Sequence, residues 1–410
     1  MDRNAKLDIL VWGATSSVGR LVAEYLLGRY GVGRDLNWAL GGRSRDKLER
    51  LRTELANIDP KAMELPILIA DAMDAKSLDQ IVPQVQVVAT TVGPYALYGR
   101  ELVAACARHG ADYCDLTGEV LFIRDMIDQH HAEAVKSGAR LVPCCGFDSI
   151  PSDLGVLMMN EHMRAHYGAP CDEVKFFLTG ASGGVGGGTV LSALHQFEQA
   201  KNPKARRVLA NPYSLNPVSS ERGADTYDSM DARWDWDLGG WTGPFIMAGV
   251  NTRIVRRSNA LAGFAYGKGF RYSEAWGFSK GIRGWLQAQS LAFGMKATLG
   301  CLQFAAARSM ALKFLPQSGE GPSKEARDRG FFKVRLFGIG KQRLQGRVVG
   351  TSDPGHGETA KMFGESAVCL ALDRRDGKAK EGGVLTPATA MGMRLVDRLR
   401  SAGMTFEVDG

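Results

Sequence analysis

The chain has 410 residues, of which 45% are hydrophobic and 23% charged, so it is long enough for two domains and is not a disordered or low-complexity protein. The formal net charge is +7, and the seven cysteines form no C-x-x-C pair and no spacing with histidine suited to zinc, so we expect reduced thiols and no metal site. The first residues run into a predicted strand without the apolar segment of a signal peptide, which favours a cytoplasmic protein.

Short apolar runs alternate with helical patterns over residues 1–150. This alternation predicts an α/β fold with a doubly wound parallel sheet, the Rossmann arrangement. The strands are expected near residues 7–12, 36–41, 66–70, 86–90, 111–114 and 139–143. The helices are expected near residues 17–30, 44–56, 75–82, 99–109 and 122–137.

The turn after the first strand is the most informative motif. Its spacing is Gly13-x-x-Ser16-x-x-Gly19, a variant of the G-x-G-x-x-G fingerprint without the middle glycine in its usual place. A dinucleotide diphosphate needs free N–H groups at a helix N-terminus and small residues that let it approach, although a glycine-bearing turn of any α/β protein has a similar sequence. The predicted cofactor-binding residues are Gly13, Ala14, Thr15, Ser16, Ser17, Val18 and Gly19, with hydroxyls of Thr15 to Ser17 helping to hold phosphate.

The end of the second strand decides between NAD and NADP. An NAD site places a carboxylate there for the ribose, whereas the 2′-phosphate of NADP requires a cation. This chain has Arg43 at the tip and no acid, so we predict NADP(H) as the cofactor, bound by Arg43 and Ser44. The alternatives are that Arg43 is simply exposed at a helix start and that Ser44 caps that helix.

Two further loops lie at the same predicted sheet edge. Asp71, after the third strand, is expected to accept a hydrogen bond from the adenine amino group, or else to cap the next helix. Thr91, Val92, Gly93 and Tyr95 follow the fourth strand and are predicted neighbours of the nicotinamide ribose, with loop packing as the alternative.

The sequence pattern changes after about residue 170. A strand at 174–178, a glycine-rich stretch at 180–188 and a helix at 189–199 are followed by loop-like Asn-Pro pairs at 202–217. Residues 331–337 and 343–349 alternate as an antiparallel pair, and helices are expected at 359–372 and 386–401. We therefore predict a Rossmann domain (1–168), an α+β domain with an antiparallel sheet that contacts substrate or lipid (169–351), and C-terminal helices that pack back on the first domain (352–410).

Residues 251–315 are both basic and aromatic. They contain ten Lys or Arg against one acid, Glu274. This pattern suits contact with a membrane surface or an amphiphilic acyl substrate, and a core helix pair with solvated cationic faces is the alternative. No apolar run within this region is long enough to span a bilayer, and no nucleic-acid motif accompanies the charge, so nucleic acid is not an expected partner.

Five separated motifs carry a resemblance to a known family. The chain resembles the saccharopine dehydrogenase-like oxidoreductases, in particular the trans-acting enoyl reductases. This resemblance implies an NADP-binding Rossmann domain, a second domain that covers the nicotinamide, and a reductase that acts on an enoyl chain in lipid or polyketide assembly. The motifs are Val92–Gly99, Tyr113–Glu119, Cys145–Asp153, Gly319–Ser323 and Gly382–Ala388.

Reduction of an enoyl thioester needs a hydride at the β-carbon and a proton at the α-carbon, so an acid is sought near the nicotinamide. Tyr95 and Tyr98 have suitable hydroxyls, and each can equally be a packed aromatic residue. Asp148 and Ser149 lie on the loop after the sixth strand, where either can instead cap the following helix. Glu119 is interpreted as a substrate-orienting residue or an ion-pair partner, and His195 as a satisfied helix histidine.

Three functions are compatible with these observations. The first is an NADPH-dependent reductase of an acyl or polyketide intermediate that is free or carrier-bound. The second is a saccharopine-type amino-acid dehydrogenase, for which Arg233, Arg271 and Arg335 would have to converge on a polar cleft. The third is a nucleotide-bound protein of a lipid surface with little turnover. Peripheral membrane contact and a homodimer are left open.

Overall fold

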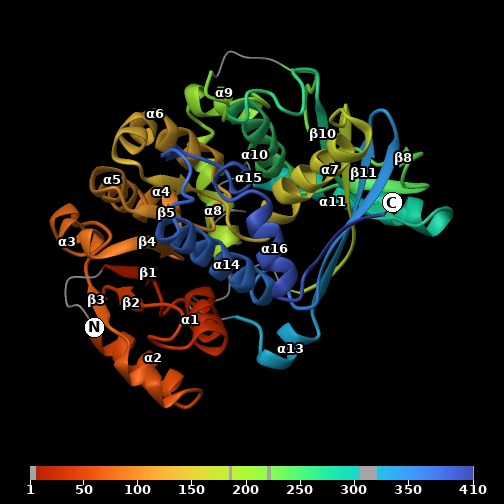
Figure 1. Cartoon of the computed structure of the whole chain (residues 1–410). Helices are drawn as coiled ribbons and strands as arrows, with labels where there is room; N and C mark the ends of the chain where they lie inside the picture. The colour runs from red at the N-terminus through yellow and green to blue at the C-terminus, as the bar shows by residue number, and fades with distance from the viewer. Residues whose placement is uncertain (1–5, 184–186, 219–222, 303, 305–320, 410) are drawn as a thin grey trace.

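The computed structural model describes residues 6–183, 187–218, 223–302, 304 and 321–409. The predicted motif at Gly319–Ser323 and the predicted basic region at 251–315 therefore lie partly outside the described residues. The strands form two seven-stranded sheets, and Figure 1 shows helices packed between and around them.

The first sheet is parallel throughout, as predicted. Its order is β13-β6-β5-β4-β1-β2-β3, so the strand order reverses between β1 and β4, the point where dinucleotides bind in Rossmann folds. The seventh strand, β13, comes from near the C-terminus and was not predicted, because two residues give no readable pattern. The strands are β1 (Leu7–Trp12), β2 (Trp38–Gly42), β3 (Ile67–Ile69), β4 (Val85–Thr90), β5 (Asp112–Cys114), β6 (Arg140–Val142) and β13 (Gly383–Val384).

The helices of this half lie close to their predicted positions because caps mark their ends. Ser16 accepts a hydrogen bond from Gly19 N–H at the start of α1, and Gly110 and Gly138 end α5 and α6 in the left-handed conformation. The helices are α1 (Ser17–Tyr30), α2 (Arg45–Ala56), α3 (Ala75–Ile81), α4 (Tyr95–Tyr98), α5 (Arg100–His109) and α6 (Val120–Ser137), with 3-10 turns η1 (Pro60–Glu64) and η2 (Val82–Gln84).

The second sheet is mixed. The predicted antiparallel pair β11–β12 is confirmed, but β7 pairs with β10 in parallel, so the sheet is not antiparallel throughout. The order is β14-β12-β11-β7-β10-β9-β8. The strands are β7 (Glu173–Ser182), β8 (Arg233–Asp235), β9 (Gly240–Pro244), β10 (Arg271–Phe278), β11 (Phe331–Ile339), β12 (Arg343–Gly350) and β14 (Thr405–Asp409).

One face of the second sheet carries the core of this half. Alternate apolar residues such as Val334 and Leu336 pack against α7 (Ile150–Tyr167), and α10 (Ala248–Leu261) packs against β10. Helix α11 (Ile282–Cys301) lies against β9 on the same face. The approach is close, since a Cβ added at Gly243 of β9 would lie 3.4 Å from the carbonyl oxygen of Ala288. Small residues thus let this helix approach the sheet closely.

Two predictions about local structure were wrong. Residues 202–217 are not all loop, because α9 (Pro203–Ala210) begins there; Asn202 accepts from Lys204 N–H, so this Asn-Pro pair is a helix start. The helix predicted at 386–401 is two helices, α15 (Pro387–Ala390) and α16 (Met393–Ser401), separated at Gly392 with φ of 61°. The other helices are α8 (Gly187–Gln199), α13 (Lys324–Asp328) and α14 (Gly357–Arg375).

The predicted cationic surface of residues 251–315 is wrong for its first part. Arg253, Arg256 and Arg257 lie on α10 and are almost completely buried. Arg256 pairs with Asp225 at 2.8 Å, and Arg257 donates to the carbonyl oxygens of Leu215 and Val384. Buried guanidinium groups are stable only with such partners, so this helix belongs to the core. None of the described helices is long and apolar enough to cross a membrane.

The last part of the chain contributes to both halves. Helix α14 packs against α1, β1 and β4, while β14 joins the edge of the second sheet. Glu365 of α14 accepts hydrogen bonds from Tyr25 and Tyr30 of α1 and pairs with Arg398 of α16 at 2.9 Å. The boundaries at residues 168 and 351 stay a prediction.

Candidate functional site

The turn between β1 and α1 has the geometry of a dinucleotide site. Gly13 has φ of 78°, and a Cβ added there would lie 2.5 Å from Val92 Cγ2. A Cβ at Gly19 would lie 2.3 Å from Gly13 O. Both positions therefore require glycine, and the N-terminus of α1 opens at the strand reversal, where free N–H groups bind phosphate.

The hydroxyl of Ser16 already has partners in this turn. It accepts from Gly19 N–H at 3.0 Å and shares a hydrogen bond of 2.8 Å with Thr91. Thr91 also donates to Gly13 O at 3.0 Å. Thr91 thus ties the loop after β4 to the phosphate turn, while Thr15 and Ser17 have no hydrogen bond from their hydroxyls to any described residue.

The predicted adenosine end of the site is at the tips of β2 and β3. Arg43 is exposed and forms no ion pair with a described residue. Ser44 is the N-cap residue of α2, but its side chain makes no capping hydrogen bond. Asp71 accepts from Met73 N–H at 2.9 Å, and the cap of α3 is Asp74, so the alternative reading of Asp71 as that cap is wrong. All three side chains are therefore compatible with a role at the adenosine end.

The residues after β4 divide between the cofactor edge and the core. Thr91 and Val92 contact Gly13 directly. Tyr95 is buried; its hydroxyl donates to Thr90 O at 3.3 Å and accepts from Leu116 N–H at 3.2 Å. Burial raises the pKa of Tyr95 well above its usual value. Tyr98, by contrast, is 40% exposed.

Glu119 holds the start of α4. Its two carboxylate oxygens accept from Tyr95 N–H at 2.8 Å and Ala96 N–H at 2.9 Å. Ser192 of α8 donates to the same carboxylate at 2.6 Å. Glu119 therefore caps a helix and links it to the second half of the chain, and it forms no ion pair with a described residue.

The loop after β6 places the carboxyl group of Asp148 at the same edge of the sheet. Asp148 is half-buried and makes no hydrogen bond to any described residue, and burial raises its pKa to about 6. The expected alternative, that its carboxylate caps α7, is wrong, since the N-cap residue is Ser149. Ser149 is fully buried and donates to Asn251 Oδ1 at 3.0 Å.

Asp148 lies where the two halves of the chain meet. A Cβ added at Gly118, on the loop after β5, would lie 3.7 Å from Asp148 Oδ2 and 3.5 Å from Met247 Cε. Met247 comes from the segment between β9 and α10. The carboxyl group thus borders both the carboxyl edge of the parallel sheet and the second sheet's segment, where a substrate between them would lie.

Comparison with known proteins identifies the family. Residues 9–142 match the family model of the saccharopine dehydrogenase NADP binding domain. A Mycobacterium tuberculosis (strain H37Rv) protein provisionally named a trans-acting enoyl reductase is 40% identical over 98% of this chain and 97% of its own length. The chain belongs to the saccharopine dehydrogenase-like family of trans-acting enoyl reductases. It is an NADP-dependent oxidoreductase.

One further relative supports the family, and one solved structure has the same fold. A trans-acting enoyl reductase of Mycobacterium bovis (strain BCG) is 37% identical over 98% of this chain and 97% of its own length. The fold is that of the apo saccharopine dehydrogenase (L-Glu forming) of Saccharomyces cerevisiae, with a TM-score of 0.51, 13% identity and coverage of 98% and 99% of the two chains.

One residue that borders the predicted phosphate turn, His356, was not singled out from the sequence. His356 is buried, and its Nδ1 lies 3.0 Å from Asp353 Oδ2. A Cβ added at Gly321 would lie 3.6 Å from His356 Nε2 and 2.4 Å from Ser17 Oγ. His356 is the N-cap residue of α14, so this enoyl reductase family member brings a second helix start to the turn. The sequence feature that accompanies His356 is Asp-x-x-His directly before a helix.

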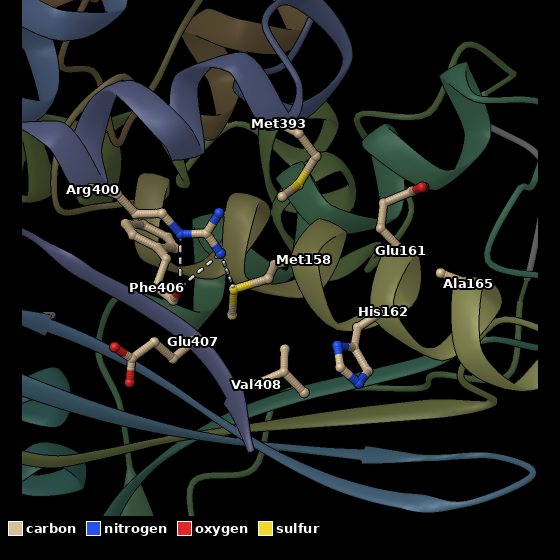
Figure 2. Close-up of a pocket in the computed structure, with 9 residues that line it drawn as sticks. All are labelled: Met158, Glu161, His162, Ala165, Met393, Arg400, Phe406, Glu407 and Val408. Carbon is tan, nitrogen blue, oxygen red and sulfur yellow. Dashed lines mark hydrogen bonds between the residues drawn. The ribbon is translucent and has the colours of Figure 1, made fainter. Parts of the chain in front are cut away.

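A pocket of about 530 Å³ lies elsewhere and is shown in Figure 2. It lies between the C-terminal half of α7, α16 and β14. Met158 and His162 are more than two helical turns from the start of α7, where Ser149 and Asp148 lie, so this pocket is distinct from the cofactor edge. Its lining residues are Met158, Glu161, His162, Ala165, Met393, Arg400, Phe406, Glu407 and Val408.

The arginines required by a saccharopine-type substrate do not converge. Arg271 and Arg335 are exposed and lie on the face of the second sheet opposite Tyr272, Val334 and Leu336, which pack in the core. Arg233 is exposed on the edge strand β8. His195 lies 3.2 Å from Gln199 Nε2 on the same helix, as expected for a satisfied helix histidine.

Proposed function

We propose that the protein uses NADPH to reduce the C=C bond of a long acyl or polyketide intermediate in lipid biosynthesis, acting in trans on a free or carrier-bound thioester. The names of the relatives support this reaction. The exposed, separated arginines disfavour the alternative substrate, an amino acid with several carboxylates, because such a substrate needs cations that converge.

The residues present fit NADP(H). The glycines at 13 and 19 leave room for a diphosphate at the start of α1, and Arg43 is available for the 2′-phosphate. We assign Ser44, Asp71, Thr91 and Val92 to the same edge, and His356 to the diphosphate side. The nicotinamide supplies a hydride to the β-carbon of the enoyl group.

We propose that the carboxyl group of Asp148 supplies the proton in the second half of the reaction. After hydride addition, the α-carbon of the thioester needs one proton. Asp148 donates it and regains a proton from water, which balances the step. A raised pKa keeps a fraction of this group protonated near neutral pH, and the absence of a hydrogen bond to any described residue leaves the proton free to transfer.

The other predicted catalytic residues are Tyr95, Ser149 and Tyr98, and we propose that the first two position the site. Tyr95 positions the loop after β4, because its hydroxyl is held by two backbone groups. Ser149 orients the start of α7 through Asn251. Tyr98 is exposed and is the alternative proton donor.

The test is a comparison of substrates. The purified protein is incubated with NADPH and either a long-chain 2-enoyl thioester or 2-oxoglutarate with lysine, and products are identified by mass. The proposal expects consumption of NADPH only with the enoyl thioester. Turnover of 2-oxoglutarate with lysine alone would show a saccharopine-type dehydrogenase instead. NADPH binding without turnover of either substrate would favour the nucleotide-bound protein of a lipid surface. Light scattering on the same sample tests whether the protein is a monomer or a homodimer.

A further inference from the structure

Helix α11 exposes a stripe of large apolar side chains. Ile282, Trp285, Leu286 and Phe293 follow one another at spacings of three, one and seven residues, which places them on one face of the helix. Ile282 and Phe293 are each 76% exposed. Large apolar side chains gathered on an exposed face mark a contact surface.

The opposite face of the same helix is already covered. Gly284, Ala288 and Ala292 are its buried residues and lie against β9. The exposed side of α11 also carries Arg283, Gln289 and Lys296, so its exposed apolar surface is the stripe of four large side chains and not the whole helix. The described part of the chain leaves this stripe uncovered, and burial of large apolar side chains in a second apolar environment is favourable.

The charges on α11 and on the residues just before it are all positive. Residues 279–302 contain Lys280, Arg283 and Lys296 and no acid. Lys280 and Arg283 are exposed and form no ion pair with a described residue, while Lys296 pairs with Asp231 at 2.6 Å. This arrangement is complementary to a negatively charged partner.

We propose that α11 docks on an anionic phospholipid bilayer, with Ile282, Leu286 and Phe293 inserted among the acyl chains and Lys280 and Arg283 at the headgroups. An amphipathic helix with Trp, Phe and Leu on one face and flanking cations binds bilayers in this way. A second copy of the chain fits less well, because symmetric pairing through α11 would bring like charges together. The docking goes beyond the reaction proposed above and does not require it.

The helix lies at the end of the molecule opposite α2 and α3 in Figure 1. Docking through this end leaves the adenosine end of the cofactor site, at the tips of β2 and β3, away from the membrane. Binding of NADPH and binding of vesicles are therefore expected to be independent measurements.

The experiment is co-sedimentation of the full chain with vesicles of phosphatidylcholine alone or with phosphatidylglycerol. The double variant I282E/F293E tests the stripe and K280E/R283E tests the charges. The matched control is I58E, which places the same charge at an apolar residue that is 57% exposed after α2. NADPH binding confirms that each variant is folded.

We expect binding to the phosphatidylglycerol vesicles that weakens about tenfold or more in either double variant and not in I58E, and that falls with added salt. Absence of vesicle binding by the unaltered chain overturns the proposal, as does binding that I282E/F293E leaves unchanged. A dimer dissociated by I282E/F293E, without vesicle binding, would assign the stripe to a second copy. Enoyl turnover in solution without vesicle binding would overturn the docking alone.

Discussion

At the scale of single residues, we propose that Arg43 selects NADP(H) over NAD(H). Its guanidinium is exposed at the tip of β2 and has no ion-pair partner among the described residues. In R43A we expect the Kd for NADPH to rise by roughly 10- to 100-fold and the Kd for NADH to stay the same, since only the contact with the 2′-phosphate is lost. Fluorescence titration with both cofactors measures this.

The control for R43A is R45A, which removes a neighbouring exposed arginine that pairs with Glu49. It should change neither affinity. H356A should weaken NADPH and NADH equally, because the diphosphate is common to both. Equal loss of both cofactors in R43A would show that Arg43 does not contact the 2′-phosphate.

Asp148 is expected to make the reaction pH-dependent. Because an acid donates only in its protonated form, kcat/KM should fall as the pH rises above about 6, the raised pKa of this carboxyl. D148N should lower kcat by about 100-fold or more and lose this limb of the profile, while NADPH affinity is unchanged. If D148N keeps the pH profile of the unaltered protein, Asp148 is not the proton donor and Tyr98 is the next residue to test.

The sequence could predict residues whose role depends on local spacing. Gly13, Gly19 and Arg43 could be proposed because the turn and the strand tip have fixed offsets from the pattern of β1 and β2. The position of Asp148 between the two halves could not be predicted, because it depends on how the loop at Gly118 meets the segment of Met247, which lies 99 residues after Asp148 in the chain. His356 lies even further from the turn that it borders.

At the scale of elements, the start of α1 tests the close packing of the phosphate turn. A Cβ at Gly19 would lie 2.3 Å from Gly13 O, so G19A should destabilise the protein by about 1–3 kcal/mol and abolish NADPH binding. Gly28 of the same helix has nothing within 4 Å of its Cβ position. G28A should raise stability by roughly 0.5–1 kcal/mol through helix propensity.

Urea unfolding and NADPH titration of both variants measure these effects. Similar behaviour of G19A and G28A would contradict the role given to the turn.

The elements themselves were predictable where the hydrophobic period and the caps agreed, as in α1 and β4. Elements were predicted wrongly where one residue type is compatible with two structures. Asn202-Pro203 was predicted to be loop and begins a helix, and Gly392 divides a segment that was predicted to be one helix.

At the scale of the whole molecule, buried acids link stability to pH. Burial raises the pKa values of Asp115, Asp153 and Glu274 to about 7. The folded state then binds more protons than the unfolded state above pH 4, so stability falls as the pH rises through 7. We expect the free energy of unfolding to fall by about 2 kcal/mol between about pH 6.5 and 8.

Urea unfolding at both pH values measures this loss. D153N should remove part of it, because an amide can still accept from Ala388 N–H and donate to the Ser258 hydroxyl that holds Asp153. Stability that rises over this range would contradict the assignment. The sequence could not predict these groups, because their burial arises from contacts between distant segments such as α7, α10 and α15.

The proposed reaction is decided by the structure of the product formed from a long-chain 2-enoyl thioester and NADPH in D₂O, determined by mass spectrometry and NMR. We expect a saturated thioester with solvent deuterium at the α-carbon and hydrogen from NADPH at the β-carbon, formed much more slowly by D148N. An unreduced thioester, with NADPH still bound, would contradict the proposed reaction.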